Sequence, residues 1–184
     1  MGKTRLALSP RENHWWHVTL NVTARGLATP PIAHGTTLFD VEFDFVDHRL
    51  VIRTSDGGRR TMSLASRSVA DFYREYLASL GDLGLTVRFR AVPDEIEDPI
   101  PFGDDRQHAT YDADQVNRFW RVLVQADRIL RRFRGRFVRQ TAERINFLRD
   151  VHLGLLPRLR IPETVAFLEE LRGLFLLDPP PRGA

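Results

Sequence analysis

The sequence contains no cysteine, a single lysine and no long apolar run. Without cysteine, the chain can form no disulfide bond, no thiolate metal site and no cysteine nucleophile. No apolar stretch reaches the roughly 20 residues of a membrane-spanning helix, so we expect no membrane partner. No charged-then-apolar leader with a cleavage site is evident either, and we therefore expect a cytoplasmic protein.

Recognisable catalytic motifs are also missing from the sequence. It has no Gly-x-Ser-x-Gly nucleophile elbow, no phosphate-binding loop and no dinucleotide fingerprint. We therefore predict no cofactor and assign no enzyme class from a motif.

What remains is the composition of an ordinary folded domain. The 184 residues are 42% hydrophobic and 28% charged, which is typical of a globular protein with one core. The net charge is +3. Because Lys3 is the only lysine, almost all of the positive charge is carried by arginine, which we attribute to genomic base composition rather than to a function.

Alternating apolar and polar residues predict an antiparallel sheet. The predicted fold class is α+β: a twisted antiparallel sheet of about six strands, with helices packed on one face and a C-terminal helical segment. Two of the strands follow tight turns within residues 45–64. The remaining strands are expected at residues 4–8, 14–25, 39–45 and 85–91.

The two turns set an expected register for the hairpins. A turn at Asp47-His48 pairs Phe45 with Leu50, Phe43 with Ile52, and Glu42 with Arg53. A three-residue loop at Asp56-Gly57-Gly58 then pairs Ile52 with Met62 and Leu50 with Leu64. This register places apolar residues opposite apolar ones, and it puts a glycine at the left-handed position of a bulged turn.

Helices are expected where apolar residues recur at helical spacing. Ser68 with Asp71 forms a capping-box-like start, and Asp112 with Gln115 starts a long helix. A long acidic loop occupies residues 93–111 between them. The domain boundaries predicted from these patterns are an α+β domain at 1–139, a helical segment at 140–177 packed on it, and a disordered tail at 178–184.

Several sequence words carry a resemblance to a known family. The chain resembles a bacterial family of uncharacterised proteins, a domain of unknown function, over residues 2–137. Because that family has no established activity, the resemblance implies a shared fold and no specific function. The matching words include Asn13 to His17, Ala24 to Leu27, Phe43 to Leu50, Ser68 to Tyr73, Pro99 to Phe102 and Tyr111-Asp112.

The chain departs from the family pattern at its end. Members of that family continue after the arginine-rich helix with a segment rich in His, Phe and Trp, whereas residues 139–177 here predict amphipathic helices. If the family has an active site that uses the missing segment, this chain lacks that activity. We expect the C-terminal helices to pack on the chain's own core as a monomer, with a homodimer through them as the alternative.

The leading site hypothesis rests on the expected strand at 14–25. Successive side chains of a strand face opposite sides, so Trp15, His17 and Arg25 are expected on the polar face of the sheet. A tryptophan beside a histidine on such a face indicates binding of a small molecule or a protein partner. The ligand-binding candidates are Trp15, His17, Arg25, Glu42, Asp44 and Arg53.

Other site types were weighed against ordinary structural roles. His14 and His17 would lie on opposite faces of the strand, so we predict no metal site. The carboxylates of Asp40, Glu42 and Asp44 share one face and fit a solvated surface with Glu42 paired to Arg53. A hydrolase-like enzyme using His17 and Glu42 as acid and base is the lower alternative.

The first alternative, ranked above the hydrolase, is binding of nucleic acid or phosphate by the arginine-rich end of the long helix. Guanidinium groups suit phosphate oxygens, although Phe133 and Phe137 interrupt the run with core-like spacing. The acidic loop also offers internal partners for these cations. The phosphate-binding candidates are Arg128, Arg131, Arg132 and Arg139.

Overall fold

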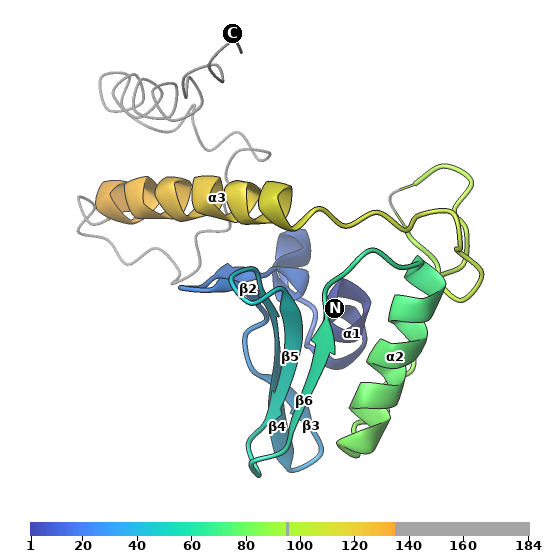
Figure 1. Ribbon diagram of the computed structural model, residues 1–184. Helices are drawn as coiled ribbons and strands as arrows, with labels where there is room; N and C mark the ends of the chain where they lie inside the picture. The colour runs from blue at the N-terminus through green and yellow to red at the C-terminus, as the bar shows by residue number, and fades with distance from the viewer. Residues whose placement is uncertain (95, 135–184) are drawn as a thin grey trace, which may run out of the picture. The chain divides into compact units, whose positions relative to one another are not determined.

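Six short strands form one antiparallel sheet in the computed structural model, which describes residues 1–94 and 96–134 (Figure 1). The chain divides into two units, Met1–Trp120 and Arg121–Ala184, and the whole sheet belongs to the first. The strands are β1 (Asn21–Val22), β2 (Gly26–Ala28), β3 (Ile32–His34), β4 (Thr37–Asp44), β5 (Arg49–Thr54) and β6 (Arg59–Ser63). The helices are α1 (Gly2–Leu8), the 3-10 helix η1 (Asn13–Val18), α2 (Val69–Asp82) and α3 (Ala113–Arg134).

The strand order is β1-β2-β4-β5-β6, and β3 also pairs with β4. Both β2 and β3 lie along the edge of β4 opposite β5, because Phe43 pairs with Leu27 and Phe39 pairs with Ile32. Pro30-Pro31 separates the two short strands, since proline has no N–H to donate to a ladder. Thr29 continues the pairing locally: its Oγ1 accepts the N–H of Val41.

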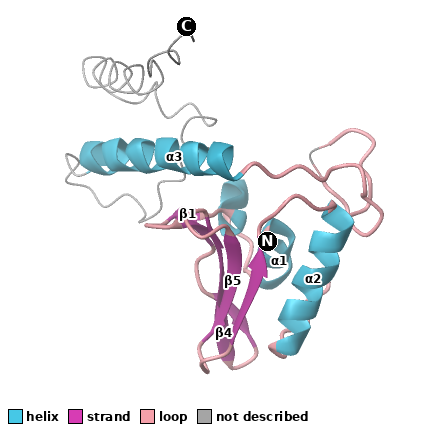
Figure 2. Ribbon diagram, viewed as in Figure 1, coloured by secondary structure: helices cyan, strands magenta, loops and turns pink. Residues whose placement is uncertain are grey.

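The core lies on one face of this sheet, beneath α1 and α2 (Figures 1 and 2). Phe39, Val41, Leu50 and Ile52 are buried there together with residues of α2 and with Leu85, which follows it. The Thr4 hydroxyl of α1 hydrogen-bonds the Tyr76 hydroxyl of α2 at 3.0 Å, which links the two helices. The α+β prediction, with helices packed on one face of a sheet of about six strands, is confirmed.

Three predicted strands are wrong. Residues 4–8 form α1, which buries Thr4 and Arg5. Residues 14–25 form η1, the two-residue strand β1 and a turn rather than one strand. Residues 85–91 do alternate in burial, but they pair with no strand, and Phe89 packs against Tyr73 of α2. The alternating sequence of residues 85–91 therefore reflects a more buried and an exposed side of the segment, and not hydrogen bonding to another described strand.

The hairpin registers differ from the prediction by two residues. Phe43 pairs with Leu50 and Leu50 pairs with Met62, so a two-residue shift keeps every core residue on the core face. The β4–β5 loop is wider than predicted because one carboxylate oxygen of Asp44 accepts the N–H groups of Val46 and Asp47, both at 3.0 Å. The predicted left-handed glycine is present at Gly57, with φ of 92°.

Local signals at helix starts are confirmed. The Ser68 hydroxyl accepts the N–H of Asp71 at 3.1 Å and begins α2. The Asp112 carboxylate accepts the N–H of Gln115 at 3.0 Å and begins α3. Among the described residues, no helix is long and apolar enough to cross a membrane. The predictions for residues 140–177 and 178–184 lie outside the described residues.

Gly26 allows β2 to approach β4 closely, so we expect a methyl group at this position to destabilise the fold strongly. A Cβ at Gly26 would lie 1.8 Å from the Phe43 carbonyl oxygen, which is itself part of the β2–β4 ladder. We expect Gly26→Ala to lower the free energy of unfolding by about 3 kcal/mol. Gly81→Ala is the matched control, because nothing lies within 4 Å of its Cβ position in α2. It should raise stability by about 0.5–1 kcal/mol. Denaturant melts in which Gly26→Ala matches wild type would contradict the close approach.

Candidate functional site

Trp15 projects from η1 into solvent. Its side chain is 57% exposed, and its backbone has φ of 61°, a left-handed conformation that a bulky residue rarely adopts. The Trp15 ring stacks on the His17 ring, with centroids 5.8 Å apart and planes 22° apart. The Arg11 guanidinium lies 5.9 Å from the Trp15 ring centroid, within cation–π range. We call these three residues the Trp15 surface.

His17 supports this surface from inside. It is only 2% exposed, and its Nδ1 accepts the N–H of Glu12 at 3.3 Å. In the neutral ring the proton therefore resides on Nε2. The backbone carbonyl of His17 accepts a hydrogen bond from the Arg5 side chain of α1, which ties η1 to that helix. His17 thus acts as a structural residue that holds the turn beneath Trp15.

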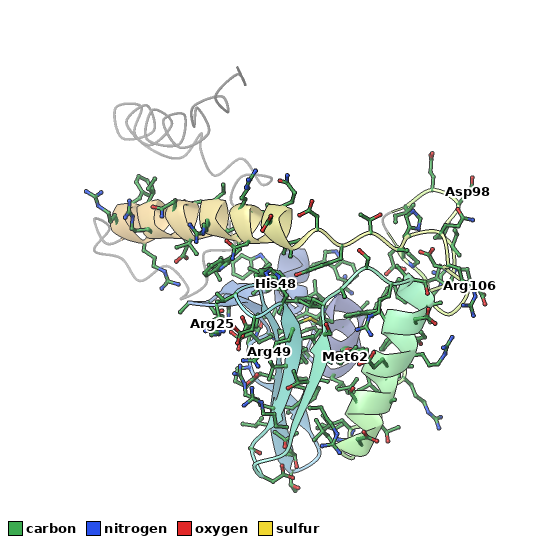
Figure 3. All side chains as sticks on the ribbon, in the orientation of Figure 1. Arg25, His48, Arg49, Met62, Asp98 and Arg106 are labelled. Atoms are coloured by element: carbon green, nitrogen blue, oxygen red, sulfur yellow. The ribbon has the colours of Figure 1, made fainter. Side chains whose placement is uncertain are left out.

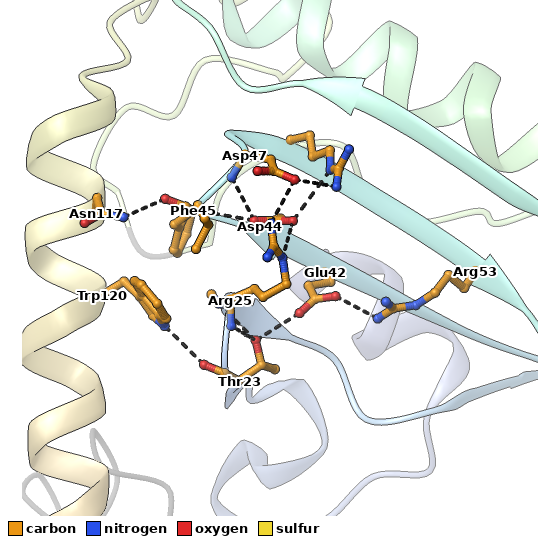
Figure 4. A network of polar contacts seen from close by, with 12 residues as sticks. Thr23, Arg25, Glu42, Asp44, Phe45, Asp47, Arg53, Asn117 and Trp120 are labelled. Carbon is orange, nitrogen blue, oxygen red and sulfur yellow. Dashed lines mark hydrogen bonds and ion pairs between the residues drawn. The ribbon is translucent and has the colours of Figure 1, made fainter.

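The other four ligand-binding candidates form a separate network on the polar face of the sheet (Figure 4). The expected strand that would have placed Trp15 and His17 on this face does not form, so that placement is wrong. The hydrolase alternative required His17 and Glu42 on one face of the sheet, but His17 lies on η1 and Glu42 on β4. The four residues that the structure does bring together are Arg25, Glu42, Asp44 and Arg53.

Asp44 is the most buried charge of this network. Its side chain is 4% exposed, and its Oδ2 accepts the Nε–H of Arg25 at 2.8 Å. Arg49 also pairs with Asp44, and Asp47 pairs with both arginines, so two carboxylates share two guanidinium groups. Arg25 lies in the turn before β2 and Arg49 begins β5, and Figure 3 labels both side chains. This four-residue set is the Asp44 cluster: Arg25, Asp44, Asp47 and Arg49.

The pKa of Asp44 follows from these contacts. Burial by itself raises the pKa of a carboxyl group, because the charged form loses solvent. The hydrogen bonds from Arg25 and from the N–H groups of Asp47 and Val46 outweigh that effect and hold the pKa of Asp44 below its ordinary value. The Asp44 carboxylate is therefore a stabilised anion and not a proton donor near neutral pH.

Glu42 lies beside this cluster and is equally engaged. Its carboxylate accepts the Thr23 hydroxyl at 2.9 Å and pairs with Arg53 at 2.9 Å. Arg53 also pairs with Asp40, the residue directly opposite it in the ladder. The predicted Glu42–Arg53 ion pair is present although the predicted register is not, because the long arginine side chain reaches diagonally across two positions.

Several residues of the network were not singled out from the sequence. Thr23 accepts the N–H groups of Arg25 and Gly26 in the β1–β2 turn, and its carbonyl accepts the indole N–H of Trp120 at 3.2 Å. Asn117 donates to the Phe45 carbonyl at 2.8 Å. Asp47 and Arg49 lie at the predicted turn. The only sequence signal for their ion pair is that an aspartate and an arginine stand two residues apart.

The arrangement has little capacity for chemistry. Every carboxylate of the polar face holds an arginine, so none is left as a free base beside an open position. Within residues 1–94 and 96–134, no group of three or more His, Asp or Glu side chains is arranged to hold a metal ion. The ion pairs and hydrogen bonds of this network are best explained as contacts that hold adjacent segments of the sheet together.

Three of the four phosphate-binding candidates lie on α3, in the second unit. Arg128, Arg131 and Arg132 are exposed, and Arg131 pairs with Asp127 at 2.6 Å. The acidic loop pairs elsewhere: Asp94 binds Lys3, and Asp105 binds His108. Arg139 lies outside the described residues.

The buried Asp44 predicts a difference between two isosteric substitutions on β4. Asp44→Asn keeps an acceptor for the turn but removes the charge held by Arg25 and Arg49, so we expect a loss of about 2 kcal/mol at pH 7. Asp40→Asn is the matched control, because Asp40 is more exposed and Arg53 keeps Glu42. It should cost less than about 1 kcal/mol.

The same pair gives a signed pH dependence. The pKa of Asp44 is lowered by folding, so its contribution is present above the unfolded pKa and is lost as pH falls through the folded pKa. The stability gap between wild type and Asp44→Asn should therefore begin to narrow below about pH 4 and close as the pH falls through the folded pKa. A gap that stays constant from pH 7 to pH 3 in denaturant melts would contradict the assigned charge.

Comparisons with known proteins identify the family of this chain, but that family has no described function. No curated protein and no solved structure matches the chain. One family model matches residues 1–151, which is most of the chain, and its description is a family of unknown function, DUF5996. The predicted membership of a domain-of-unknown-function family is thus confirmed, and the chain belongs to the DUF5996 family.

Proposed function

We propose that the first unit is a non-enzymatic binding domain that recognises a partner protein through the Trp15 surface. The observation that carries this proposal is the exposed, left-handed Trp15. A large aromatic side chain that is 57% exposed gains little for folding, yet its backbone occupies a disfavoured conformation. Such strain persists where the surroundings enforce it, and it gathers at recognition sites.

The strain has a definite size. A left-handed conformation costs a residue with a Cβ roughly 1–2 kcal/mol. Glycine or asparagine would occupy this position at lower cost. Glu12 and Arg5 both hydrogen-bond His17, whose ring stacks on the Trp15 indole, so the turn that carries Trp15 is held on both sides.

The surface is also preorganised. Trp15 rests on the ring of buried His17, and the Thr19 hydroxyl donates to the Trp16 carbonyl at 3.0 Å and fixes the end of the turn. A side chain that is ordered before binding loses less conformational entropy in the complex. We therefore expect Trp15 to contribute more binding free energy than the surface area it buries in the complex would suggest.

The geometry favours a protein partner over a small molecule. Small-molecule sites enclose most of the ligand in a concave pocket, whereas Trp15 is itself the projecting element. Tryptophan and arginine are the residues most enriched at energetic hot spots of protein interfaces, and here Arg11 lies beside Trp15. The polar face of the sheet supports no competing enzymatic role, because its carboxylates are paired.

Truncation of Trp15 tests the proposal. The full chain is used as bait in an extract of its native host, and each captured protein is then purified and titrated by calorimetry. We expect Trp15→Ala to raise the dissociation constant of the partner at least about thirtyfold, the effect of a hot-spot residue. Phe119→Ala is the matched control, since Phe119 is also 57% exposed. It should leave the affinity unchanged.

Folding is checked in the same variants. Because Trp15 is mostly exposed, Trp15→Ala should change the free energy of unfolding by no more than roughly 0.5 kcal/mol. Trp15→Gly should be the more stable of the two variants, because glycine relieves the left-handed strain. The proposal is overturned if every captured protein binds Trp15→Ala and Trp15→Gly as tightly as wild type.

A further inference from the structure

We infer that the part of α3 within the second unit binds the phosphate groups of a nucleic acid. This goes beyond the proposed function, which concerns the first unit. Residues 121–134 contain five arginines and only one acidic residue, Asp127. Such a charge excess on one helix is the electrostatic footprint of a polyanion-binding surface.

The arginines are gathered on one side of the helix. Arg121, Arg128 and Arg132 are separated by seven and four residues, which are close to whole turns of 3.6 residues. All three are exposed. At 1.5 Å per residue, the stripe from Arg121 to Arg132 extends over roughly 16 Å. We call these three residues the arginine stripe.

The opposite side of the same segment is committed to the protein interior. Ala126, Ile129 and Leu130 are buried, with exposed fractions of 2%, 7% and 8%. Helical spacing places Ala126 and Leu130 on the side opposite the arginine stripe, and Ile129 at its margin. In this segment the arginine stripe is thus exposed while these three apolar residues are buried.

Two members of the stripe have no partner in the described part of the chain. Arg131, next to the stripe, is held by Asp127, whereas neither Arg128 nor Arg132 makes an ion pair or hydrogen bond with a described residue. This contrasts with the polar face of the sheet, where Arg25, Arg49 and Arg53 are each neutralised. Within residues 1–94 and 96–134, the guanidinium groups of Arg128 and Arg132 are therefore exposed and not neutralised.

The ligand that fits this stripe is a polyanion with closely spaced phosphates. Duplex DNA carries one negative charge per about 1.7 Å of its axis, so a 16 Å stripe can meet several phosphates at once. Arginine binds phosphate oxygens through a planar, bidentate donor set. An anionic membrane is disfavoured, because an interfacial helix needs exposed apolar residues beside its cations, whereas Ala126, Ile129 and Leu130 of this segment are buried.

The test measures binding of fluorescently labelled 20-base-pair DNA to the full chain by anisotropy, from low to moderate salt. We expect binding that weakens steeply with salt, because displaced counterions are released. The double variant Arg128→Ala/Arg132→Ala should bind at least about tenfold more weakly at low salt. Its slope of log affinity against log salt should fall by about two, one for each lost phosphate contact.

A matched control separates a site from general charge. Arg59→Ala/Arg88→Ala removes the same charge from two exposed arginines of the first unit and should bind like wild type. The inference is overturned if wild type does not bind DNA at low salt or if both double variants weaken binding equally. It is also overturned if phosphatidylserine vesicles are bound in preference to DNA. Because Trp15→Ala leaves this stripe intact, its DNA binding should be unchanged, so the two proposals fail independently.

Discussion

The structure depends on one buried carboxylate. Asp44 lies at the end of β4, where its Oδ1 accepts two N–H groups of the following turn and its Oδ2 binds Arg25. The Arg25 carbonyl in turn accepts the Phe45 N–H at 2.8 Å. A single side chain therefore joins the β1–β2 turn, the β4–β5 turn and, through Arg49, the start of β5. A buried anion is tolerated only with this degree of pairing, and its loss would leave Arg25 and Arg49 with the more exposed Asp47 as their remaining shared carboxylate.

This constraint changes how the polar face of the sheet is interpreted. Rows of acidic and basic side chains on a strand face often indicate a catalytic or binding site. Here, each acid is matched by an arginine from a neighbouring segment, and Thr23 links Glu42 to the turn that Trp120 also contacts. The network stabilises the sheet. Recognition is better supported at residues whose exposure and conformation gain nothing for folding, namely Trp15 in the first unit and Arg128 and Arg132 in the second.

The parts of the fold that were predicted correctly depend on short-range signals. Ser68 with Asp71 and Asp112 with Gln115 begin helices through contacts three residues apart, and such contacts can be seen in a sequence. The sheet, its approximate strand number and the faces of β4 and β5 followed from alternation. The register was out of reach, because alternation has a period of two and is unchanged by a two-residue shift. Asp44 decided the shift by binding the turn.

The residues that were placed wrongly depend on side-chain contacts that alternation does not reveal. Asn13 to His17 alternates like a strand but becomes a 3-10 helix, because Glu12 closes onto His17 and Arg5 binds its carbonyl. The segment after Leu85 alternates because Phe89 packs on Tyr73. Of the six ligand-binding candidates, Arg25, Glu42, Asp44 and Arg53 are joined in one network, whereas Trp15 and His17 lie on η1.

A double-mutant cycle on Arg25 and Asp44 tests the central claim most directly. It compares the free energies of unfolding of wild type, Arg25→Gln, Asp44→Asn and the double variant at pH 7. If the buried ion pair holds the two turns together, the single effects will not add, and the coupling free energy will be at least about 1 kcal/mol. A coupling within roughly 0.3 kcal/mol of zero would mean that the two side chains act independently, and it would contradict the structural role assigned to the polar face.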